Sequence, residues 1–136
     1  MLTVLPVTVL AVGGALLAAA PANAAASQCP AGKVCIFQDS NFGGEVWVAD
    51  TVCRSDLSED YPGNYPNVND SASSIVNNTS KTIRLFENTG FAGRYVFVPA
   101  NGSIADLKQR NLTVYHNDGS IFANPGEFND VASSFC

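Results

Sequence analysis

Two short stretches of the chain concentrate oxygen-bearing side chains at matching spacing. "NDSASS" begins at Asn69 and "NDVASS" begins at Asn129. Calcium prefers six to eight hard oxygens from carboxylates, carbonyls, hydroxyls and water. In a tight loop, one such stretch offers a carboxylate, a backbone carbonyl and a hydroxyl. Because it is too short to surround an ion, a second segment must contribute the remaining oxygens.

The other reactive residue types do not form a recognisable catalytic set. His116 is the only histidine, and we interpret it as a solvated loop residue. No serine lies in a nucleophile-elbow context, no thiol is expected to be free, and the carboxylates show no evident acid/base pairing. We therefore predict no catalytic residues and no enzyme activity.

Composition and length restrict the class of protein. The chain has 136 residues, which allows one sizeable domain or two very small ones. Charged residues make up 14% of the chain, the net charge is −5, and Lys and Arg form no run. Nucleic acids and anionic membranes are therefore not expected as partners, because both are bound by clustered basic residues.

The first 26 residues predict a removable secretion signal. "VLAVGGALLAAA" is apolar and uncharged, and "PANA" resembles a cleavage site, with the cut after Ala24 or Ala26. The segment departs from the usual pattern because Lys33 is the first charged residue. A membrane anchor over residues 2–20 is the alternative, although Pro6 and the glycines weaken it. We expect a secreted, extracellular protein that has no membrane segment after cleavage.

Four cysteines follow the predicted cleavage point, namely Cys29, Cys35, Cys53 and Cys136. An even number in a small exported domain indicates two disulfides. Their spacing does not match the paired ligands of a zinc site. Three pairings are possible, and the sequence spacing alone does not choose among them.

The mature chain contains two copies of one unit. "FQDSNFGGEVWV" begins at Phe37 and "FENTGFAGRYVFV" begins at Phe86, 49 residues later. In both, a second Phe follows after five residues and a Gly after seven. An Asp-Leu pair comes next, as Asp56-Leu57 and as Asp106-Leu107, and each copy ends in its Asn-Asp-x-x-Ser-Ser stretch.

Each copy is predicted to be built from β-strands. The runs "VCIF", "EVWVA", "TIRLF" and "RYVFV" are rich in β-branched and aromatic residues and are bounded by turn residues. No segment has a sustained helical period. Four short strands in each of two copies predict a two-sheet sandwich of Greek keys. Since one copy cannot bury its apolar face alone, the two copies should pack on each other.

This ordered double pattern resembles the βγ-crystallin Greek-key motif, over about residues 34–135. The resemblance implies an all-β, disulfide-stabilised βγ-crystallin-like sandwich in a single domain, 27–136. Greek key one would span about 34–80 and Greek key two about 81–136. In addition, the leading "CPAGKVC" resembles the start of the streptomycete metalloproteinase inhibitors, which are small secreted proteins related to this fold.

The resemblance also implies two calcium ions in crossed sites. In each site the third motif residue gives its carbonyl, the fifth gives its hydroxyl, and the Asp of the other copy gives a carboxylate. The residue after the first aromatic of a hairpin adds a carbonyl, and the leading Asn holds the loop. The implied metal-site residues are Gln38, Asn69, Asp70, Ser71, Ser73, Glu87, Asn129, Asp130, Val131 and Ser133.

Ser74 and Ser134, the last residues of the two motifs, are expected to be structural. The alternative for the motifs as a whole is that their polar side chains only form Asx-turns and cap loop amides. With one carboxylate per site, we expect a dissociation constant on the order of 10⁻⁵ to 10⁻³ M.

The implied fold also selects a disulfide pairing. Cys29 and Cys35 flank "PAGKV", which can turn back on itself. In the crystallin arrangement the third strand of one copy joins the sheet of the other, beside that copy's fourth strand. Cys53 lies near the third strand of copy one and Cys136 lies in the fourth strand of copy two. We therefore predict the bridges Cys29–Cys35 and Cys53–Cys136.

The leading functional interpretation is a secreted, non-enzymatic calcium-binding module, expected to be monomeric. The alternative is a secreted inhibitor of extracellular peptidases, in particular metallopeptidases, with a contact loop in residues 58–68 or 108–127. A toxin or cell-surface-binding protein is a third class, and no residue argues for it specifically.

Overall fold

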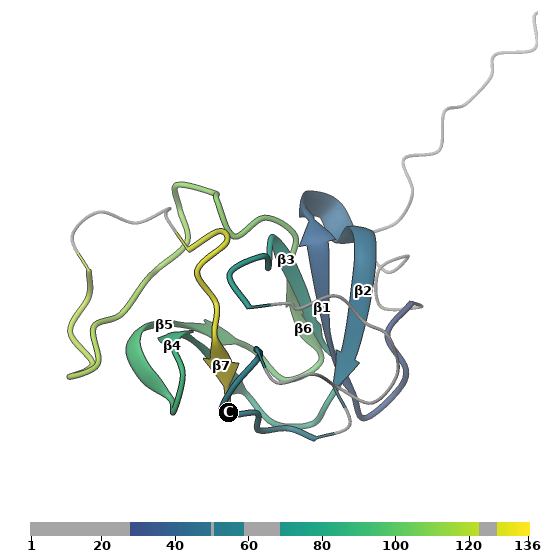
Figure 1. The fold of residues 1–136 in the computed structure, drawn as a ribbon, viewed down its shortest axis with the longest axis horizontal. Coiled ribbons are helices and arrows are strands. Elements are labelled where there is room, and N and C mark those ends of the chain that lie inside the picture. The colour runs from purple at the N-terminus through teal and green to yellow at the C-terminus, as the bar shows by residue number, and fades with distance from the viewer. Residues whose placement is uncertain (1–27, 50, 59–68, 123–127) are drawn as a thin grey trace, which may run out of the picture.

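The structure is a computed structural model that describes residues 28–49, 51–58, 69–122 and 128–136. The predicted signal segment and residues 59–68 lie outside the described residues. Within the described ranges, no helix is long and apolar enough to cross a membrane. The chain is built from antiparallel strands in two small sheets (Figure 1).

Two matching hairpins each supply two neighbouring strands to one of the sheets. In copy one, β1 (Val34–Asp39) pairs with β2 (Gly43–Ala49), joined by the short turn η3 (Ser40–Phe42). In copy two, β4 (Ile83–Asn88) pairs with β5 (Ala92–Val98). Both hairpins shift register at the same place, just before the turn. The strands predicted from the four apolar runs are therefore confirmed, and the repeat extends to the backbone.

The repeated glycines are required by the fold of these hairpins. Gly44 and Gly93 have φ angles of +71° and +81°, where a side chain is strained. A Cβ atom would lie 2.8 Å from Oδ2 of Asp39 in the first hairpin and 2.6 Å from Nδ2 of Asn88 in the second. The hairpin can then fold back so that its two motif Phe rings pack, with centroids 5.7 and 6.0 Å apart.

The two copies exchange their third strands, as the Greek-key arrangement predicts. Sheet A has the order β2-β1-β3-β6, in which β3 (Ser74–Asn77) belongs to copy one and β6 (Gly102–Ile104) to copy two. Sheet B has the order β5-β4-β7, with β7 at Ser134–Phe135. In the part of copy one that the structure describes, a single bridge is added beside β7, between Arg54 and Phe135. The expected third strand of copy one is thus reduced to one pair, because β7 offers only two residues.

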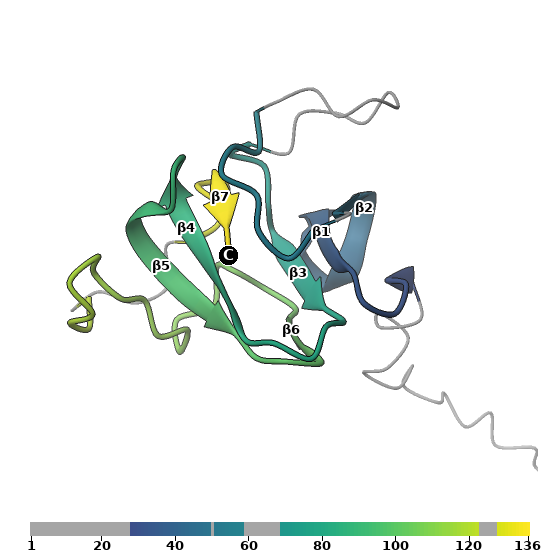
Figure 2. The ribbon, with the colours of Figure 1, turned by 90° about the horizontal axis from the view of Figure 1, so that it is seen from below.

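The main core lies between the sheets, and residues from both copies fill it. Side chains that alternate along the strands point inward, for example Ile36 from sheet A and Leu85 from sheet B, which are fully buried. The buried Trp47 packs its ring edge-on against Phe135, with the ring centroids 6.0 Å apart. Figure 2 shows the two sheets side by side from a second direction. The copies therefore complete one another, as their apolar patterns predicted.

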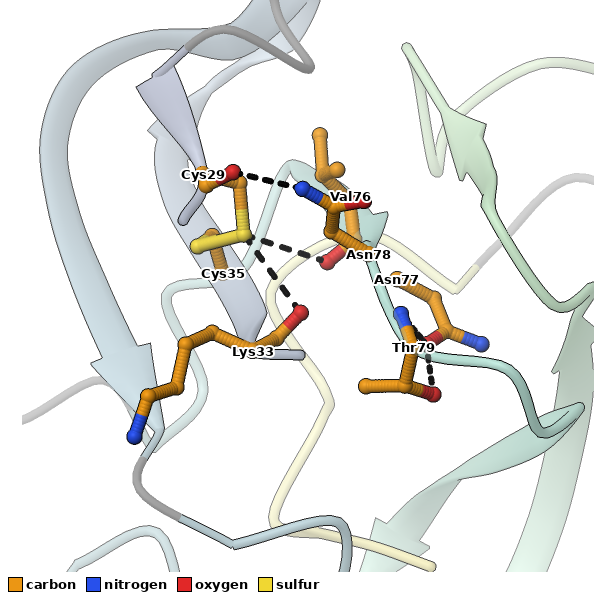
Figure 3. The surroundings of a disulfide bond; sticks show 7 residues. All are labelled: Cys29, Lys33, Cys35, Val76, Asn77, Asn78 and Thr79. Carbon is orange, nitrogen blue, oxygen red and sulfur yellow. Dashed lines mark hydrogen bonds between the residues drawn. A yellow bond between two sulfur atoms is a disulfide. The ribbon is translucent and has the colours of Figure 1, made fainter. Parts of the chain in front are cut away.

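Both predicted disulfides are present, Cys29–Cys35 and Cys53–Cys136. The first lies on the outer face of sheet A, in a second apolar cluster with Val76 (Figure 3). There the backbone carbonyl of Cys29 accepts a 2.7 Å hydrogen bond from the side-chain amide of Asn78. The short N-terminal loop is thereby joined to β1 by a covalent bond and to the residue after β3 by a hydrogen bond.

Candidate calcium sites

The two Asn-Asp-x-x-Ser-Ser loops lie against each other. The amide of Asp70 donates to the carbonyl of Ala132 at 3.1 Å, and the amide of Asp130 donates to the carbonyl of Ala72 at 3.0 Å. Both Asp residues have positive φ angles, 55° and 57°. Asp tolerates this left-handed conformation better than most residues, so its presence at this motif position suits the local backbone.

Each loop offers its hydroxyl to the carboxylate of the other loop. The Ser73 hydroxyl lies 3.4 Å from Oδ1 of Asp130, and the Ser133 hydroxyl lies 3.3 Å from Oδ1 of Asp70. Two oxygens bound to one calcium ion at about 2.4 Å and about 90° apart would be about 3.4 Å from each other. The crossed pairs therefore have the spacing of neighbouring ligands of one ion.

The leading asparagines hold the carboxylates from the opposite side. The side-chain amide of Asn69 donates to Oδ2 of Asp70 at 2.7 Å, and Asn129 makes the same bond to Asp130 at 2.5 Å. Each Asp thus has one oxygen fixed by its neighbour, while Oδ1 faces the serine of the other copy. This arrangement orients one oxygen of each carboxylate toward the predicted ion position.

The predicted hairpin residues lie beside these hydroxyls. The amide of Ser73 donates to the carbonyl of Phe37 at 3.0 Å, and Ser133 donates to Phe86 at 2.9 Å. Gln38 and Glu87 are the next residues along their strands. Ser71 and Val131, the predicted carbonyl donors, lie half-buried between the Asp and the Ser of their motifs.

Ser74 and Ser134 connect each loop to its hairpin. The buried Ser74 hydroxyl donates to the carbonyl of Asp39 at 2.6 Å and accepts the amide of Phe42 at 3.0 Å. Ser134 makes the same two bonds to the β4–β5 hairpin, at 2.5 and 3.1 Å. These contacts match the structural role expected for the last serine, because its hydroxyl is used within the backbone framework.

The repeated Asp-Leu pairs have a role that the sequence did not reveal. The amide of Leu107 donates to the carbonyl of Ser73, and the amide of Leu57 donates to the carbonyl of Ser133, both at 2.9 Å. Each pair therefore supports the loop of the other copy, while its leucine is buried in the core. The constant spacing of the pairs was the available signal, but only the exchanged strands show what they contact.

Among the described residues, no group of three or more His, Cys, Asp or Glu side chains is placed to hold a metal ion. Glu87 instead binds Arg94 through its side chain, with a shortest distance of 2.7 Å. The hydrogen bond from Arg94 lowers the pKa of Glu87. The carbonyl of Glu87 belongs to the backbone and is not consumed by this ion pair.

Two further aspartates are held in Asx-turns by the serine two residues later. Side-chain hydrogen bonds from Ser58 and Ser120 lower the pKa of Asp56 and Asp118, respectively. Neither carboxylate is part of a predicted site; Asp118 is exposed and Asp56 is half-buried. His116 is exposed on the insertion, as expected for a solvated loop residue.

Comparison with known proteins gives a family and a fold. A sequence profile of peptidase inhibitor family I36 matches residues 22–98. A βγ-crystallin from Ciona intestinalis is 27% identical, with a TM-score of 0.52, and the alignment covers 76% of this chain and 96% of that one. A structure from work on the evolution of the eye lens βγ-crystallin domain fold is 24% identical, with a TM-score of 0.56 and coverage of 79% and 86%. No curated protein matches the chain at a significant level.

Proposed function

The chain belongs to peptidase inhibitor family I36, and from this membership we propose that it is a secreted, non-enzymatic inhibitor of extracellular peptidases whose βγ-crystallin scaffold is clamped by two calcium ions. The family match supports the inhibitory part of the proposal. The crossed Ser–Asp pairs support the calcium part. Secretion is supported by the predicted signal segment.

The single observation that carries the calcium proposal is the crossing itself. Ser73 of copy one and Asp130 of copy two would bind one ion, while Ser133 and Asp70 would bind the other. The remaining protein oxygens of each ion would come from the motif carbonyls and a hairpin carbonyl. Because every ion would take ligands from both copies, calcium would join the two Greek keys and bind the folded state alone.

One carboxylate per ion sets the expected affinity. Hydroxyls and carbonyls carry no net charge, so each site has less electrostatic attraction than the acidic loops of strong calcium buffers. The affinity range of extracellular calcium modules, on the order of 10⁻⁴ to 10⁻³ M, is therefore the closest comparison. Binding of this strength raises stability only where calcium is abundant, by about 2.7 kcal/mol for each ion at 100 times the dissociation constant.

Two double variants of identical composition test the crossed arrangement. Asp70→Asn with Ser133→Ala removes two ligands of one proposed site, so isothermal titration should find one ion still bound. Asp70→Asn with Ser73→Ala removes one ligand from each site, so both ions should bind weakly or not at all. The wild-type protein should bind two ions.

Three outcomes would overturn the calcium proposal. The first is a titration of the wild-type protein with millimolar calcium that releases no heat above background. The second is an equal number of bound calcium ions in the two double variants, which would refute the crossed arrangement. The third is calcium binding by both double variants with the wild-type affinity and number of ions, which would show that these side chains are not ligands.

Inhibition is tested separately from calcium binding. The purified mature protein is incubated with secreted peptidases, with zinc metallopeptidases as the first class, in the presence and absence of calcium. Stoichiometric loss of peptidase activity supports the inhibitory function. Stabilisation by calcium without loss of any peptidase activity would leave only a calcium-binding module.

A further inference from the structure

The insertion that distinguishes copy two folds as a hairpin at the free edge of sheet B. Tyr115 exchanges two backbone hydrogen bonds with Tyr95 of β5, at 2.8 and 2.9 Å, and is also bridged to Ile121. The hairpin turn closes through two bonds: the His116 amide donates to the Ser120 carbonyl at 2.7 Å, and the Gly119 amide donates to the His116 carbonyl at 2.9 Å. We name residues 114–122 the insertion hairpin. It lies beyond β5, on the side away from sheet A, in both ribbon views (Figures 1 and 2).

An apolar band crosses from β5 onto this hairpin. The rings of Tyr95 and Tyr115 are stacked at 5.4 Å, and Phe97 meets the Tyr115 ring edge-on at 5.1 Å. Directly paired residues of antiparallel strands share a face, so the side chain of Ile121 continues the band at its outer end. Phe97 is 43% exposed and Ile121 is 67% exposed. We name Phe97, Tyr115 and Ile121 the edge patch.

The insertion hairpin is fixed on the opposite face. Val114 is fully buried in the main core. The ring of Phe122 lies 4.8 Å from the guanidinium of Arg94, which is itself held by Glu87. On the other side of Ile121, the amide of Ser120 donates to the carboxylate of Asp118 at 2.9 Å. Both neighbours of the exposed Ile121, Ser120 and Phe122, are thus restrained. A segment that is already ordered loses little conformational entropy when it binds a partner.

The backbone of Ile121 faces away from the protein sheet. The cross-strand bonds run from Phe122 to Val114 and from His116 to Ser120, on either side of the Tyr115–Ile121 pair. In an antiparallel ladder, residues placed between such bonds direct their own N–H and C=O groups to the other edge. Ile121 therefore presents an amide, a carbonyl and an exposed apolar side chain along the same free edge.

We propose that this edge enters the substrate cleft of the inhibited peptidase, where Ile121 occupies an apolar specificity pocket and its backbone pairs with the cleft as an added strand. This assignment rests on the proposed inhibitory function and specifies its contact residues. Addition of an extended segment to a free edge is a common mode of recognition, with alternate side chains giving specificity. Phe97 and Tyr115 would contact the rim of the cleft.

The side-chain chemistry defines the kind of peptidase. Ile121 carries no charge, so a pocket with a buried acidic group, as in trypsin, would be left with an unpaired carboxylate. An apolar pocket, as in chymotrypsin or a metallopeptidase with apolar specificity, would instead bury the isoleucine without that cost. The inference therefore excludes trypsin-like enzymes as targets.

The test uses the full mature protein against thermolysin, chymotrypsin and trypsin in calcium-containing buffer. The variants are Ile121→Ala and Phe97→Ala, and Val48→Ala is the matched control. Val48 lies 49 residues before Phe97, at the equivalent position of sheet A. We expect inhibition of thermolysin or chymotrypsin but not of trypsin. Ile121→Ala should raise the inhibition constant about 30-fold or more, as for a central interface residue, while Val48→Ala changes it less than about twofold.

The outcomes separate the two levels of the proposal. If the wild-type protein inhibits none of the three enzymes, the inhibitory function fails and this inference with it. If the wild type inhibits but Ile121→Ala is as potent, the function stands and the edge patch is refuted. If trypsin is the enzyme inhibited, the apolar pocket is refuted. A thermal melt of each variant, matched to wild type, shows that any loss comes from contact and not from unfolding.

Discussion

The two Greek keys agree on the side facing the core and differ on their outer faces. Toward the core, both contribute the same hairpin, the same serine contacts and the same crossed loop. Outside, the N-terminal disulfide loop covers sheet A, whereas the insertion hairpin extends sheet B. Their last strands differ as well, because β3 has four residues and partners on both sides, while β7 has two residues and one bridge outside β4.

This difference shows which features the repeat must keep and which it is free to change. The loops that meet across the centre depend on each other, so a change in one copy would disturb the site of the other. The outer faces have no such reciprocal contact. Each could therefore acquire its own covering segment, and among the described residues that of copy two carries the exposed apolar edge.

The largest expected effect concerns the weak final strand. Removing the Cys53–Cys136 bridge with two serine substitutions should lower the free energy of unfolding by about 4–5 kcal/mol, since its sequence separation is 83 residues. Removing Cys29–Cys35, with a separation of 6, should cost about 2 kcal/mol. Urea unfolding measures both. Equal losses would show that β7 does not depend on its disulfide more than the outer loop does.

The same bridge should affect calcium without providing a ligand. Cys136 follows Ser134 and Phe135, so the disulfide restrains the strand that leads directly from the loop containing Ser133 and Asp130. The single variant Cys136→Ser should therefore bind calcium more weakly, which titration would detect. Removal of Cys29, which is remote from the loops, is the control. Unchanged affinity in Cys136→Ser would separate the cysteine from the site.

The second expected effect tests the equivalence of the two loops. Asp70→Asn and Asp130→Asn should each remove most of the stabilisation due to one ion, about 2–3 kcal/mol at calcium levels near 100 times the dissociation constant. The two losses should be equal within error, because the crossed contacts are equivalent at 3.3 and 3.4 Å. Thermal melts with and without a calcium chelator measure them. A loss confined to one variant would break the symmetry.

A smaller effect is expected from the pairing of the insertion hairpin with β5, which has no counterpart among the described residues of sheet A. Tyr115→Ala should lower the free energy of unfolding by about 1–2 kcal/mol, because a half-buried aromatic ring and its stacking on Tyr95 are lost. Hydrogen exchange should quicken at the Tyr95 amide, which is bonded to the Tyr115 carbonyl. The amide of Val46, its counterpart in sheet A, should keep its rate. Equal acceleration at both would mean that the sheets are not independent on their outer faces.

The smallest effect is the pH dependence of the Glu87–Arg94 ion pair in copy two. The hydrogen bond from Arg94 holds the pKa of Glu87 below its ordinary value of 4.5. The ion pair therefore stabilises the fold above about pH 4.5 and loses that contribution as pH falls through the lower, folded-state pKa. Its counterpart in copy one is Gln38, which does not titrate.

Glu87→Gln is the matched variant for this comparison. It should cost about 0.5 kcal/mol at pH 7, since the pair is partly exposed, and nothing at pH 2. Urea unfolding in a calcium chelator at both pH values measures the difference between wild type and variant. A difference that persists at low pH would assign the effect to packing and not to charge.

Much of the fold and of the candidate site could be predicted from local patterns. The hairpins follow from short β-branched and aromatic runs joined by turns whose Gly44 and Gly93 are sterically required. The pairing of Cys53 with Cys136 followed once the family arrangement was recognised. The insertion hairpin was not predicted to pair with β5, because residue spacing alone does not indicate which edge a long insertion will join.

The sequence by itself determined the repeat, the strand runs and the residue types of the two oxygen-rich loops, because these depend on side-chain chemistry and short-range backbone geometry. The tertiary structure decided which oxygens meet. The packing of the two copies, with β6 joined to sheet A and Arg54 bridged to β7 of sheet B, brings Asp130 to Ser73 and Asp70 to Ser133. Such contacts join residues about sixty positions apart, and their geometry is fixed by packing of the common core and not by any local pattern.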